Sequence, residues 1–167
     1  MIKNKYQKFN KHYIRTNKKI LIKDYFKHAY RILKKKFKKN KKFSLIDAGC
    51  ASGFFIDYTA TKFSNVQLAG FDFSNELIKL AKKDYPFADF YIRNLLNKKF
   101  KKINQKYDVV TCLGTLHAFD NIKTPLQNLF KLTKKGGKII IFTLVNSHDV
   151  NVISRYQKNY GDDNNWY

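Results

Sequence analysis

The chain has 167 residues, an apolar share of 44% and a net charge of +22. Its length suits a single domain that can bury a core, and its apolar share excludes a disordered chain. A charge of this size favours nucleic acid or an anionic membrane surface as a partner. However, the cations are 30 lysines and only four arginines, whereas bidentate recognition of phosphate favours arginine. A solvated, lysine-rich surface is therefore the simpler interpretation, and nucleic acid is kept as the alternative.

Two cysteines are present, Cys50 and Cys112. They are too few for a disulfide framework or a zinc site, and we expect both to be small buried hydrophobic residues. No metal site is predicted. The N-terminus lacks the apolar core of a signal peptide, and no apolar run approaches the length of a transmembrane helix. We therefore expect a cytoplasmic location without a membrane span.

Most of the positive charge lies in residues 1–42, which carry 17 Lys or Arg against one acidic residue, whereas residues 43–167 carry 17 against 11. Within the first part, apolar residues recur every three or four positions, at Ile22, Phe26, Ala29, Leu33 and Phe37. This spacing predicts an amphipathic helix over about 17–37 with lysines on its other face. A basic amphipathic helix can also lie on a membrane or bind RNA. Packing on a sheet, with the lysines in water, is the simpler interpretation.

Residues 43–55, FSLIDAGCASGFF, contain the most informative pattern of the chain. An apolar run ends at Asp47 and enters a loop in which Gly49 and Gly53 frame small residues. This predicts a buried strand, a tight loop and a helix over 54–63. Small residues let backbone N–H groups approach a ligand, and a helix start offers a favourable dipole. The dinucleotide-binding fingerprint G-x-G-x-x-G is not matched, because the small residues alternate and position 54 is not glycine.

The next predicted strand, 66–74, ends in a second carboxylate, Asp72. A carboxylate at the tip of the second strand lies where it can accept hydrogen bonds from the ribose hydroxyls of a bound nucleoside. Phe73 beside it can stack on adenine. Ser74 is the better cap for a helix over 75–84, which leaves Asp72 free for a ligand.

The remaining elements continue the alternation of strands and helices. We predict a third strand over 87–92, a polar loop over 98–106, a fourth strand over 107–119 broken at Gly114, and a helix over 125–132. Residues 132–145 are predicted to contain a helix stop at Gly136-Gly137 and then the fifth strand. Strands that alternate with helices imply right-handed crossovers and a parallel, doubly wound α/β sheet.

Four features now occur in order: the Asp47–Gly53 loop, Asp72, the Y-D-V-V run at 107–110 and the K-K-G-G run at 134–137. Together they resemble the class I S-adenosylmethionine (AdoMet) methyltransferases over about residues 17–145. The loop resembles their motif I, D/E-x-G-x-G-x-G, with Ala51 in place of the middle glycine. The resemblance implies a mainly parallel sheet in the order 3-2-1-4-5, with helices on both faces. It makes 43–167 the AdoMet-binding domain and 1–42 a basic segment that packs against it or forms a lid.

The resemblance also implies roles for particular residues, with S-adenosylhomocysteine as the product. The loop surrounds the methionine part of AdoMet, Asp72 binds the ribose, and Phe73 lies against the adenine. Two residues after the third strand lie beside the adenine edge, and two at the end of the fourth lie beneath the sulfonium. The implied cofactor-binding residues are Asp47, Gly49, Cys50, Ala51, Gly53, Asp72, Phe73, Asn94, Leu95, Leu113 and Gly114.

Methyl transfer from a sulfonium is an in-line displacement, so alignment of the nucleophile supplies much of the rate. An oxygen nucleophile also needs a general base, and His117, just after the fourth strand, is the candidate. The alternative for His117 is packing under the loop as a cap of a backbone carbonyl. The segment before the first helix often covers the site in this family, which makes Tyr13 and Arg15 candidates for a lid.

The acceptor is predicted to be a small molecule with an oxygen or nitrogen nucleophile. Nucleic-acid amino-methyltransferases carry N/D-P-P-Y/F after the fourth strand, whereas residues 113–116 are Leu-Gly-Thr-Leu without proline. The tail over 145–167 faintly resembles methyltransferases of bacterial surface-polysaccharide clusters, which indicates a sugar precursor. The alternative is an RNA methyltransferase that uses the lysines of 1–42, and a third interpretation is an inactive AdoMet-binding module.

The family sheet normally adds an antiparallel hairpin after the fifth strand, and we expect this hairpin to be absent or truncated here. Two explanations are open. The favoured one is that the sequence is part of a longer protein. In the other, the exposed edge of the fifth strand pairs with a second copy to form a homodimer.

Overall fold

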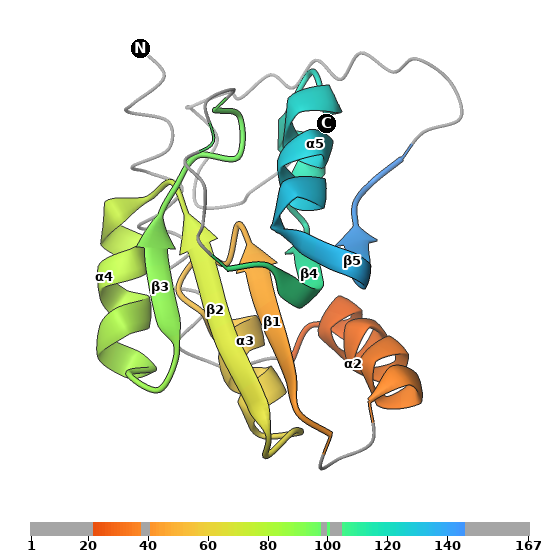
Figure 1. Ribbon diagram of the computed structural model, residues 1–167. Helices are drawn as coiled ribbons and strands as arrows, with labels where there is room; N and C mark the ends of the chain where they lie inside the picture. The colour runs from red at the N-terminus through yellow and green to blue at the C-terminus, as the bar shows by residue number, and fades with distance from the viewer. Residues whose placement is uncertain (1–21, 38–40, 98–99, 101–104, 146–167) are drawn as a thin grey trace, which may run out of the picture.

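The computed structural model describes residues 22–37, 41–97, 100 and 105–145. Its five strands form one parallel sheet in the order β3-β2-β1-β4-β5 (Figure 1), which confirms the predicted fold class and strand order. In chain order the elements are α2 (Asp24–Lys36), β1 (Phe43–Ala48), α3 (Phe54–Ala60), β2 (Val66–Asp72), α4 (Asn75–Asp84), β3 (Asp89–Ile92), β4 (Tyr107–Leu113), the 3-10 turn η1 (Leu116–Ala118), α5 (Lys123–Leu132) and β5 (Thr133–Phe142).

Strand β1 lies at the centre of the sheet, and all six of its residues are buried. It pairs with β2 on one side and with β4 on the other. A parallel strand covered on both faces has an apolar run rather than an alternating pattern, and β1 has such a run. The chain runs outward from β1 to β3 and then returns to β4, so the strand order reverses between β1 and β4. In open α/β sheets, ligands bind at the carboxyl end of such a reversal.

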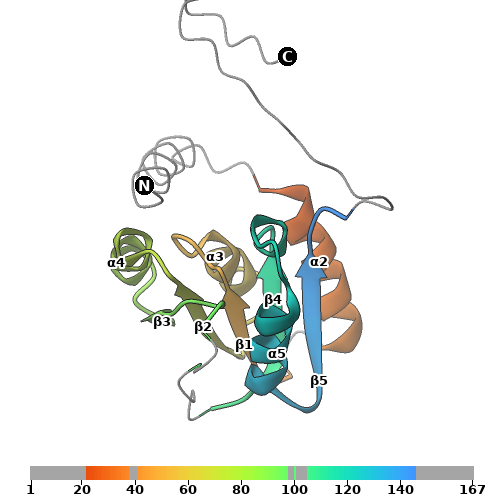
Figure 2. The ribbon, with the colours of Figure 1, turned by 90° about the horizontal axis from the view of Figure 1, so that it is seen from above.

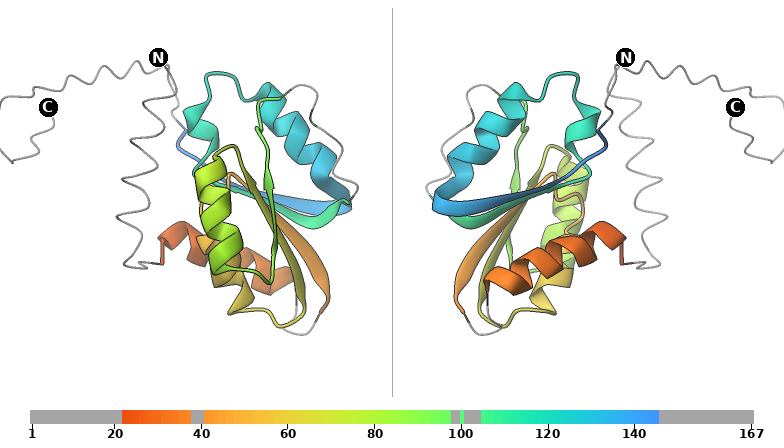
Figure 3. Two further views of the ribbon diagram at one scale, coloured as in Figure 1. Left: turned by 90° about the vertical axis from the view of Figure 1, so that its left-hand side faces the viewer. Right: turned by 90° about the vertical axis from the view of Figure 1, so that its right-hand side faces the viewer.

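The two faces of the sheet are covered unequally. Helices α2, α3 and α4 cover one face and α5 covers the other (Figure 2), and the side views place α2 and α5 on opposite sides of β5 (Figure 3). Successive strand residues serve opposite cores: Leu45 belongs to the cluster under α2, α3 and α4, and Ile46 to the cluster under α5. This is the period of two that a strand imposes.

Helix α2 is amphipathic, as predicted, and its apolar residues join the core of the sheet. Phe26, Ala29 and Leu33 are buried, and Phe37 stacks on Phe43 of β1 with 4.2 Å between ring centroids. The lysines of its last turn face solvent, where they complement the negative end of the helix dipole. Residues 17–21 of the predicted helix lie outside the described residues.

The predictions around the glycines are confirmed in part. Strand β4 ends at Leu113 and the chain turns at Gly114 (φ 73°) into η1, so the predicted break at Gly114 is correct, although no strand continues to 119. Helix α5 ends at Leu132, as predicted, but the helix stop predicted at Gly136-Gly137 is wrong, because β5 begins directly at Thr133. The β4–β5 register shifts between Tyr107 and Val109, and Gly136 (φ 73°) lies in this irregular part. The glycine pair therefore bends a strand and does not stop a helix.

Strand β2 ends at Asp72, as predicted. Two other predicted boundaries differ by a few residues: helix α3 ends at Ala60 rather than 63, and β3 starts at Asp89 rather than 87. The predicted loss of the C-terminal hairpin concerns residues 146–167, outside the described part of the chain. No helix within the described residues is long and apolar enough to cross a membrane.

Candidate cofactor and active site

The loops that follow β1 and β4 meet at the point where the strand order reverses. Gly49 has a positive φ of 76°, and a Cβ there would collide with the side chain of Thr115 in the loop after β4. The N–H groups of Gly49 and Cys50 both donate to the carbonyl of Phe71, at 2.8 and 3.0 Å. A larger residue at 49 is therefore excluded by conformation and by space.

The second half of the loop is as constrained as the first. Gly53 precedes α3 with a φ of 88°, and a Cβ there would lie 2.9 Å from the Tyr85 ring and 3.1 Å from the Phe90 ring. Between the glycines, Ala51 also has a positive φ, 49°. A side chain in this conformation costs about 1–2 kcal/mol. The loop is thus held in a strained shape that its neighbours determine.

The main-chain donors of the loop are largely committed within the protein. Besides Gly49 and Cys50, Gly53 donates to the Cys50 carbonyl at 2.9 Å, and Ala51 donates to the Asp72 carboxylate at 3.1 Å. The sequence led us to expect that N–H groups of this loop face a ligand, but these four donate within the protein instead. The loop offers a ligand a closely approachable surface of small residues instead.

Asp72, at the end of β2, connects the loop to the next helix. Its carboxylate accepts hydrogen bonds from the N–H of Ser74 at 2.9 Å and of Ala51 at 3.1 Å. Burial raises the pKa of Asp72, and hydrogen bonds from the backbone N–H groups of Ser74, Ala51 and Phe73 offset part of this rise. The expectation that Ser74 caps α4 is correct, since its hydroxyl accepts from Leu77. The expectation that Asp72 is wholly free is wrong, although a carboxylate offers about four acceptor positions.

Asp47 is a second buried carboxylate, at the end of β1. It accepts one hydrogen bond, from the Thr111 hydroxyl at 2.6 Å. Burial raises the pKa of Asp47 to about 7, against the effect of Thr111, and the charge of Asp72 raises it further. Neither Asp47 nor Asp72 has an ion-pair partner among the described residues, whose ion pairs are Lys27–Asp24 and Lys134–Asp108. This edge of the sheet therefore holds two buried carboxyl groups without a cationic partner among the described residues.

Thr111 was not predicted as a site residue. It lies directly opposite Asp47 in the parallel pairing of β1 with β4. In the sequence it stands out only as a polar residue within the apolar run of β4, and the sequence does not show its partner. The structure buries it completely.

The residues expected beside adenine follow β2 and β3. Phe73 is 52% exposed, directly after Asp72. The N–H of Arg93 donates to the main-chain carbonyl of Asp72 at 2.9 Å, which joins the ends of β3 and β2. Asn94 is exposed, whereas the side chain of Leu95 is buried in the core under α5. Only the main chain of Leu95 is therefore left to meet a ligand.

The residues expected beneath the sulfonium lie at the end of β4. Leu113 is buried, and Gly114 donates to the carbonyl of Phe142 at 2.8 Å. The hydroxyl of Tyr25 lies 3.8 Å from the Cβ position of Gly114, and the Tyr25 ring stacks on Phe142 with centroids 4.9 Å apart. Sequence reasoning missed Tyr25, because only the packing of α2 brings it from the first helix to this strand end.

The candidate base, His117, lies in η1 and is exposed, whereas Leu116 before it is buried. No described residue forms a hydrogen bond with the His117 ring, so the alternative of a packed, carbonyl-capping histidine does not hold for this part of the chain. Tyr13 and Arg15, the lid candidates, lie outside the described residues.

Both cysteines are buried, as predicted. The Cys50 sulfur lies 2.8 Å from the Cβ position of Gly70 in β2, and burial raises the pKa of its thiol well above the ordinary value. Burial raises the pKa of Cys112 to about 12. Cys50 can therefore meet a ligand through its main chain alone. Among the described residues, no three His, Cys, Asp or Glu side chains are grouped to hold a metal.

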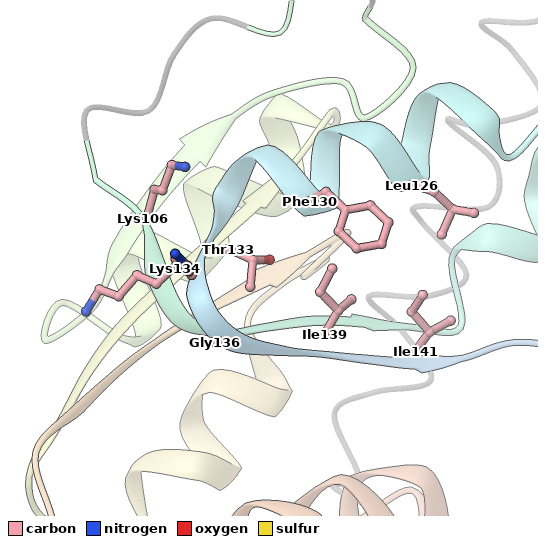
Figure 4. A pocket seen from close by; sticks show the side chains of 10 residues that line it. Lys106, Leu126, Phe130, Thr133, Lys134, Gly136, Ile139 and Ile141 are labelled. Carbon is pink, nitrogen blue, oxygen red and sulfur yellow. The ribbon is translucent and has the colours of Figure 1, made fainter.

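A hollow of about 610 Å³ lies away from these residues, between α5 and β5 (Figure 4). Apolar side chains from both elements, including Phe130 and Ile139, line it, and Lys106 and Lys134 lie at one end. None of the candidate cofactor-binding residues contributes to it. We therefore place the candidate site at the carboxyl ends of the strands and not in this hollow.

The chemistry at the strand ends fits AdoMet. Two buried carboxylates without a cationic partner favour a ligand with positive charge, and AdoMet carries an ammonium and a sulfonium group. Asp72 has acceptor positions left for ribose hydroxyls, and the exposed ring of Phe73 offers a stacking surface. Gly49 lets the loop after β1 pack directly against Thr115 in the loop after β4, at the point where the strand order reverses.

Comparison with known proteins agrees with this fit. Residues 46–139 match the methyltransferase-domain family. The 235L protein of Invertebrate iridescent virus 6, which bears the name of a methyltransferase, is 27% identical over 69% of this chain and 43% of its own. A malonyl-[acyl-carrier protein] O-methyltransferase of Ilyobacter polytropus is 27% identical over 64% of this chain and 40% of its own.

Among solved structures, the plantazolicin methyltransferase in complex with a triazolic desmethyl analogue and S-adenosylhomocysteine is similar, with a TM-score of 0.59 and 27% identity. The similarity covers 68% of this chain and 43% of that one. The chain spans about two fifths of the length of these relatives. Because the family match covers more than half of the chain, the protein belongs to the methyltransferase-domain family.

Proposed function

We propose that the protein transfers a methyl group from AdoMet to an oxygen or nitrogen nucleophile of a small molecule. One observation carries the proposal: Asp72 accepts a hydrogen bond from Ala51, so the glycine loop after β1 and the carboxylate after β2 form one unit at the strand reversal. A nucleoside with a cationic tail fits this unit because the ribose needs acceptors and the tail needs negative charge.

The proposed roles follow the positions of the residues. Asp72 accepts the ribose hydroxyls, Phe73 stacks on adenine, and Asn94 with the main chain of Leu95 meets the adenine edge. Asp47 and the loop to Gly53, including Gly49, Cys50 and Ala51, surround the methionine part, and Leu113 with Gly114 lies beneath the sulfonium. When bound, AdoMet supplies an activated methyl group for in-line displacement.

We assign the acceptor side to the loop after β4. His117 is exposed there, at the same strand end as Gly114, and can take a proton from an oxygen nucleophile. Residues 43–167 are proposed as the AdoMet-binding domain. Residues 1–42 then supply the packing helix, with Tyr13 and Arg15 in a lid that closes the site.

The finer proposal for the acceptor is a sugar or polysaccharide precursor. It rests on the resemblance of the tail, whose residues beyond 145 lie outside the described part of the chain. Relatives are named for plantazolicin and for a malonyl-[acyl-carrier protein], so related domains accept quite different molecules. Assays of methyl transfer from labelled AdoMet to sugar nucleotides, acyl carriers and RNA would separate these acceptors.

Calorimetric titration of the 167-residue chain with S-adenosylhomocysteine tests the proposal. We expect micromolar binding, on the order of −8 kcal/mol. Asp72→Asn keeps the shape of the side chain but removes its charge, and we expect about 100-fold weaker binding, because hydrogen bonds to a charged group are worth about 1.5–3 kcal/mol each. Asp84→Asn, at an exposed position of α4, is the matched control and should leave affinity unchanged.

A folded chain that does not bind the ligand would refute the proposal. The RNA alternative makes a separate prediction, because binding through lysines weakens steeply with salt. Titration with single-stranded RNA at two salt concentrations therefore distinguishes it from methyl transfer to a small acceptor, whose affinity should depend little on salt.

A further inference from the structure

Asn128 is a polar side chain in the middle of α5 that is completely buried. Its amide nitrogen donates to two main-chain carbonyls, that of Leu95 at 2.9 Å and that of Asn97 at 3.0 Å. Its amide oxygen accepts from Lys131 at 3.2 Å. Both N–H donors of the amide and its oxygen are thus used, as burial of a polar group requires.

The two carbonyls belong to the loop that follows β3. At its start, Arg93 donates to the main chain of Asp72, which fixes the loop to the end of β2. Asn94 then forms a turn, with its side-chain oxygen accepting from the N–H of Leu96 at 2.8 Å and its carbonyl from the N–H of Asn97 at 3.2 Å. Asn128 holds this turn from α5, through its bonds to the carbonyls of Leu95 and Asn97.

Two polar groups of this loop remain available to a ligand, one hydrogen-bond donor and one acceptor. The N–H of Leu95 has no partner within the described part of the chain, and the carboxamide oxygen of Asn94, exposed at the tip, has capacity for a second hydrogen bond. A donor beside an acceptor matches the N1 and 6-amino edge of adenine. Hypoxanthine presents the reverse pattern, with an acceptor at position 6 and a donor at N1.

We propose that Asn128 is a positioning residue for nucleobase recognition. By fixing the carbonyls of Leu95 and Asn97, it aims the remaining polar groups of the turn at adenine and makes the site discriminate against hypoxanthine. Asn128 acts through the loop and does not touch the ligand. The inference rests on the proposed AdoMet function and adds to it the residue that sets base selectivity.

The test compares S-adenosylhomocysteine with S-inosylhomocysteine, which differs only at the base edge, by calorimetry on the full chain. A site with matched polar groups rejects the mismatched base. In Asn128→Leu, which keeps the branching of the side chain but removes the amide, we expect the preference for adenine to fall by about tenfold, the worth of one well-placed hydrogen bond. Gln127→Leu makes the same chemical change at the exposed neighbouring position and should keep the preference.

Leu129→Ala distinguishes a positioning role of Asn128 from a purely structural one. This variant weakens the packing of α5 without removing a hydrogen bond to the loop. This variant should lose stability but keep the preference. If Asn128→Leu also keeps the preference, Asn128 has no positioning role, although binding of S-adenosylhomocysteine would still support the proposed function. If the native chain binds neither ligand, the proposed function fails, and this inference fails with it.

A second measurement needs no substitution and covers the case in which Asn128→Leu does not fold. In nitrogen-15 spectra of the native chain, we expect the side-chain amide resonances of Asn128 to shift when S-adenosylhomocysteine is added. The side-chain resonances of Asn65, before the opposite end of β2, should stay in place. Unchanged Asn128 resonances at saturating ligand would overturn the inference.

Discussion

Asp47 and Asp108 lie near opposite ends of the central strands β1 and β4, and the protein treats them in opposite ways. Asp108 accepts hydrogen bonds from the N–H and hydroxyl of Ser44, each at 2.8 Å, and from Lys134 at 2.9 Å. Burial alone would raise the pKa of Asp108, but these hydrogen bonds outweigh it and lower the pKa. Within the described part of the chain, Asp47 accepts a hydrogen bond only from the Thr111 hydroxyl, and burial raises its pKa to about 7.

The difference is instructive because cations are abundant in this chain. With 30 lysines available, the described residues pair one with Asp108 and none with Asp47 or Asp72. A buried carboxylate without a partner lowers the stability of the folded state. Groups perturbed in this way cluster at functional sites. One strand end therefore serves stability, whereas the other retains charge that a cationic ligand can neutralise.

The largest change in stability is expected for Asp47→Asn, which keeps the shape of the side chain and removes its charge. The rise of the pKa from 3.8 to about 7 corresponds to a destabilisation of about 4 kcal/mol by the ionised form at pH 8. We expect the variant to be more stable by about 2–4 kcal/mol in urea unfolding at pH 8. The amide oxygen can still accept the Thr111 hydroxyl.

The pH dependence of this gain follows from the sign of the shift. Because the folded state binds the proton more tightly, native stability rises as the pH falls from about 7 towards 4. The advantage of Asp47→Asn should therefore shrink to about half at pH 5.5. A variant that is less stable than the native chain at pH 8 would show that Asp47 has a favourable partner in the folded protein.

Asp108→Asn should lower the free energy of unfolding, and by less than Asp47→Asn raises it. The side chain of Asp108 is 34% exposed, so solvent screens its interactions, and we expect a loss of about 1–2 kcal/mol at pH 7. Since the folded pKa is lowered, the loss should disappear as the pH falls below about 4. Urea unfolding at pH 7 and pH 3 measures it. A loss that persists at pH 3 would assign the effect to packing and not to charge.

Much of this architecture could be predicted from the sequence, because it depends on local patterns. The apolar run before Asp47 and the spacing of apolar residues in α2 each identify an element with few alternatives. The glycine pair at 136–137 misled the prediction, since glycine with positive φ ends a helix in one context and bends a strand in another. Only the pairing of β5 with β4 decides between the two.

The residues of the candidate site also differ in whether they could be predicted from the sequence. Asp47, Gly49 and Asp72 could be predicted because parallel strands bring their carboxyl ends to one edge. Thr111, Tyr25 and Asn128 could not, because each acts on a partner distant in sequence: the bond from Thr111 to Asp47 spans 64 residues and that from Asn128 to Leu95 spans 33. Such roles are set by tertiary packing, which a single sequence does not display.

Ala51→Gly tests whether backbone strain, in addition to buried charge, lowers stability at the end of the sheet that carries the candidate site. Ala51 is the one non-glycine residue with positive φ in the described part of the chain. Its replacement should relieve about 1–2 kcal/mol of strain but increase the freedom of the unfolded chain, for a net gain of about 0.5–1 kcal/mol. Ala60→Gly, in the last position of α3, is the control and should lose up to about 1 kcal/mol. Equal losses in both variants would mean that Ala51 is unstrained.

The smallest change in stability should come from removing Lys134, the cation that pairs with Asp108. Lys134 is 46% exposed, and exposed ion pairs contribute about 0.2–1 kcal/mol, so Lys134→Met should lose about 0.5 kcal/mol at low salt. The loss should fall in 1 M sodium chloride, where screening acts over about 3 Å. The double variant with Asp108→Asn isolates the pair energy. If that coupling is near zero, Ser44 alone lowers the pKa of Asp108, and the two strand ends differ in hydrogen bonding rather than in charge pairing.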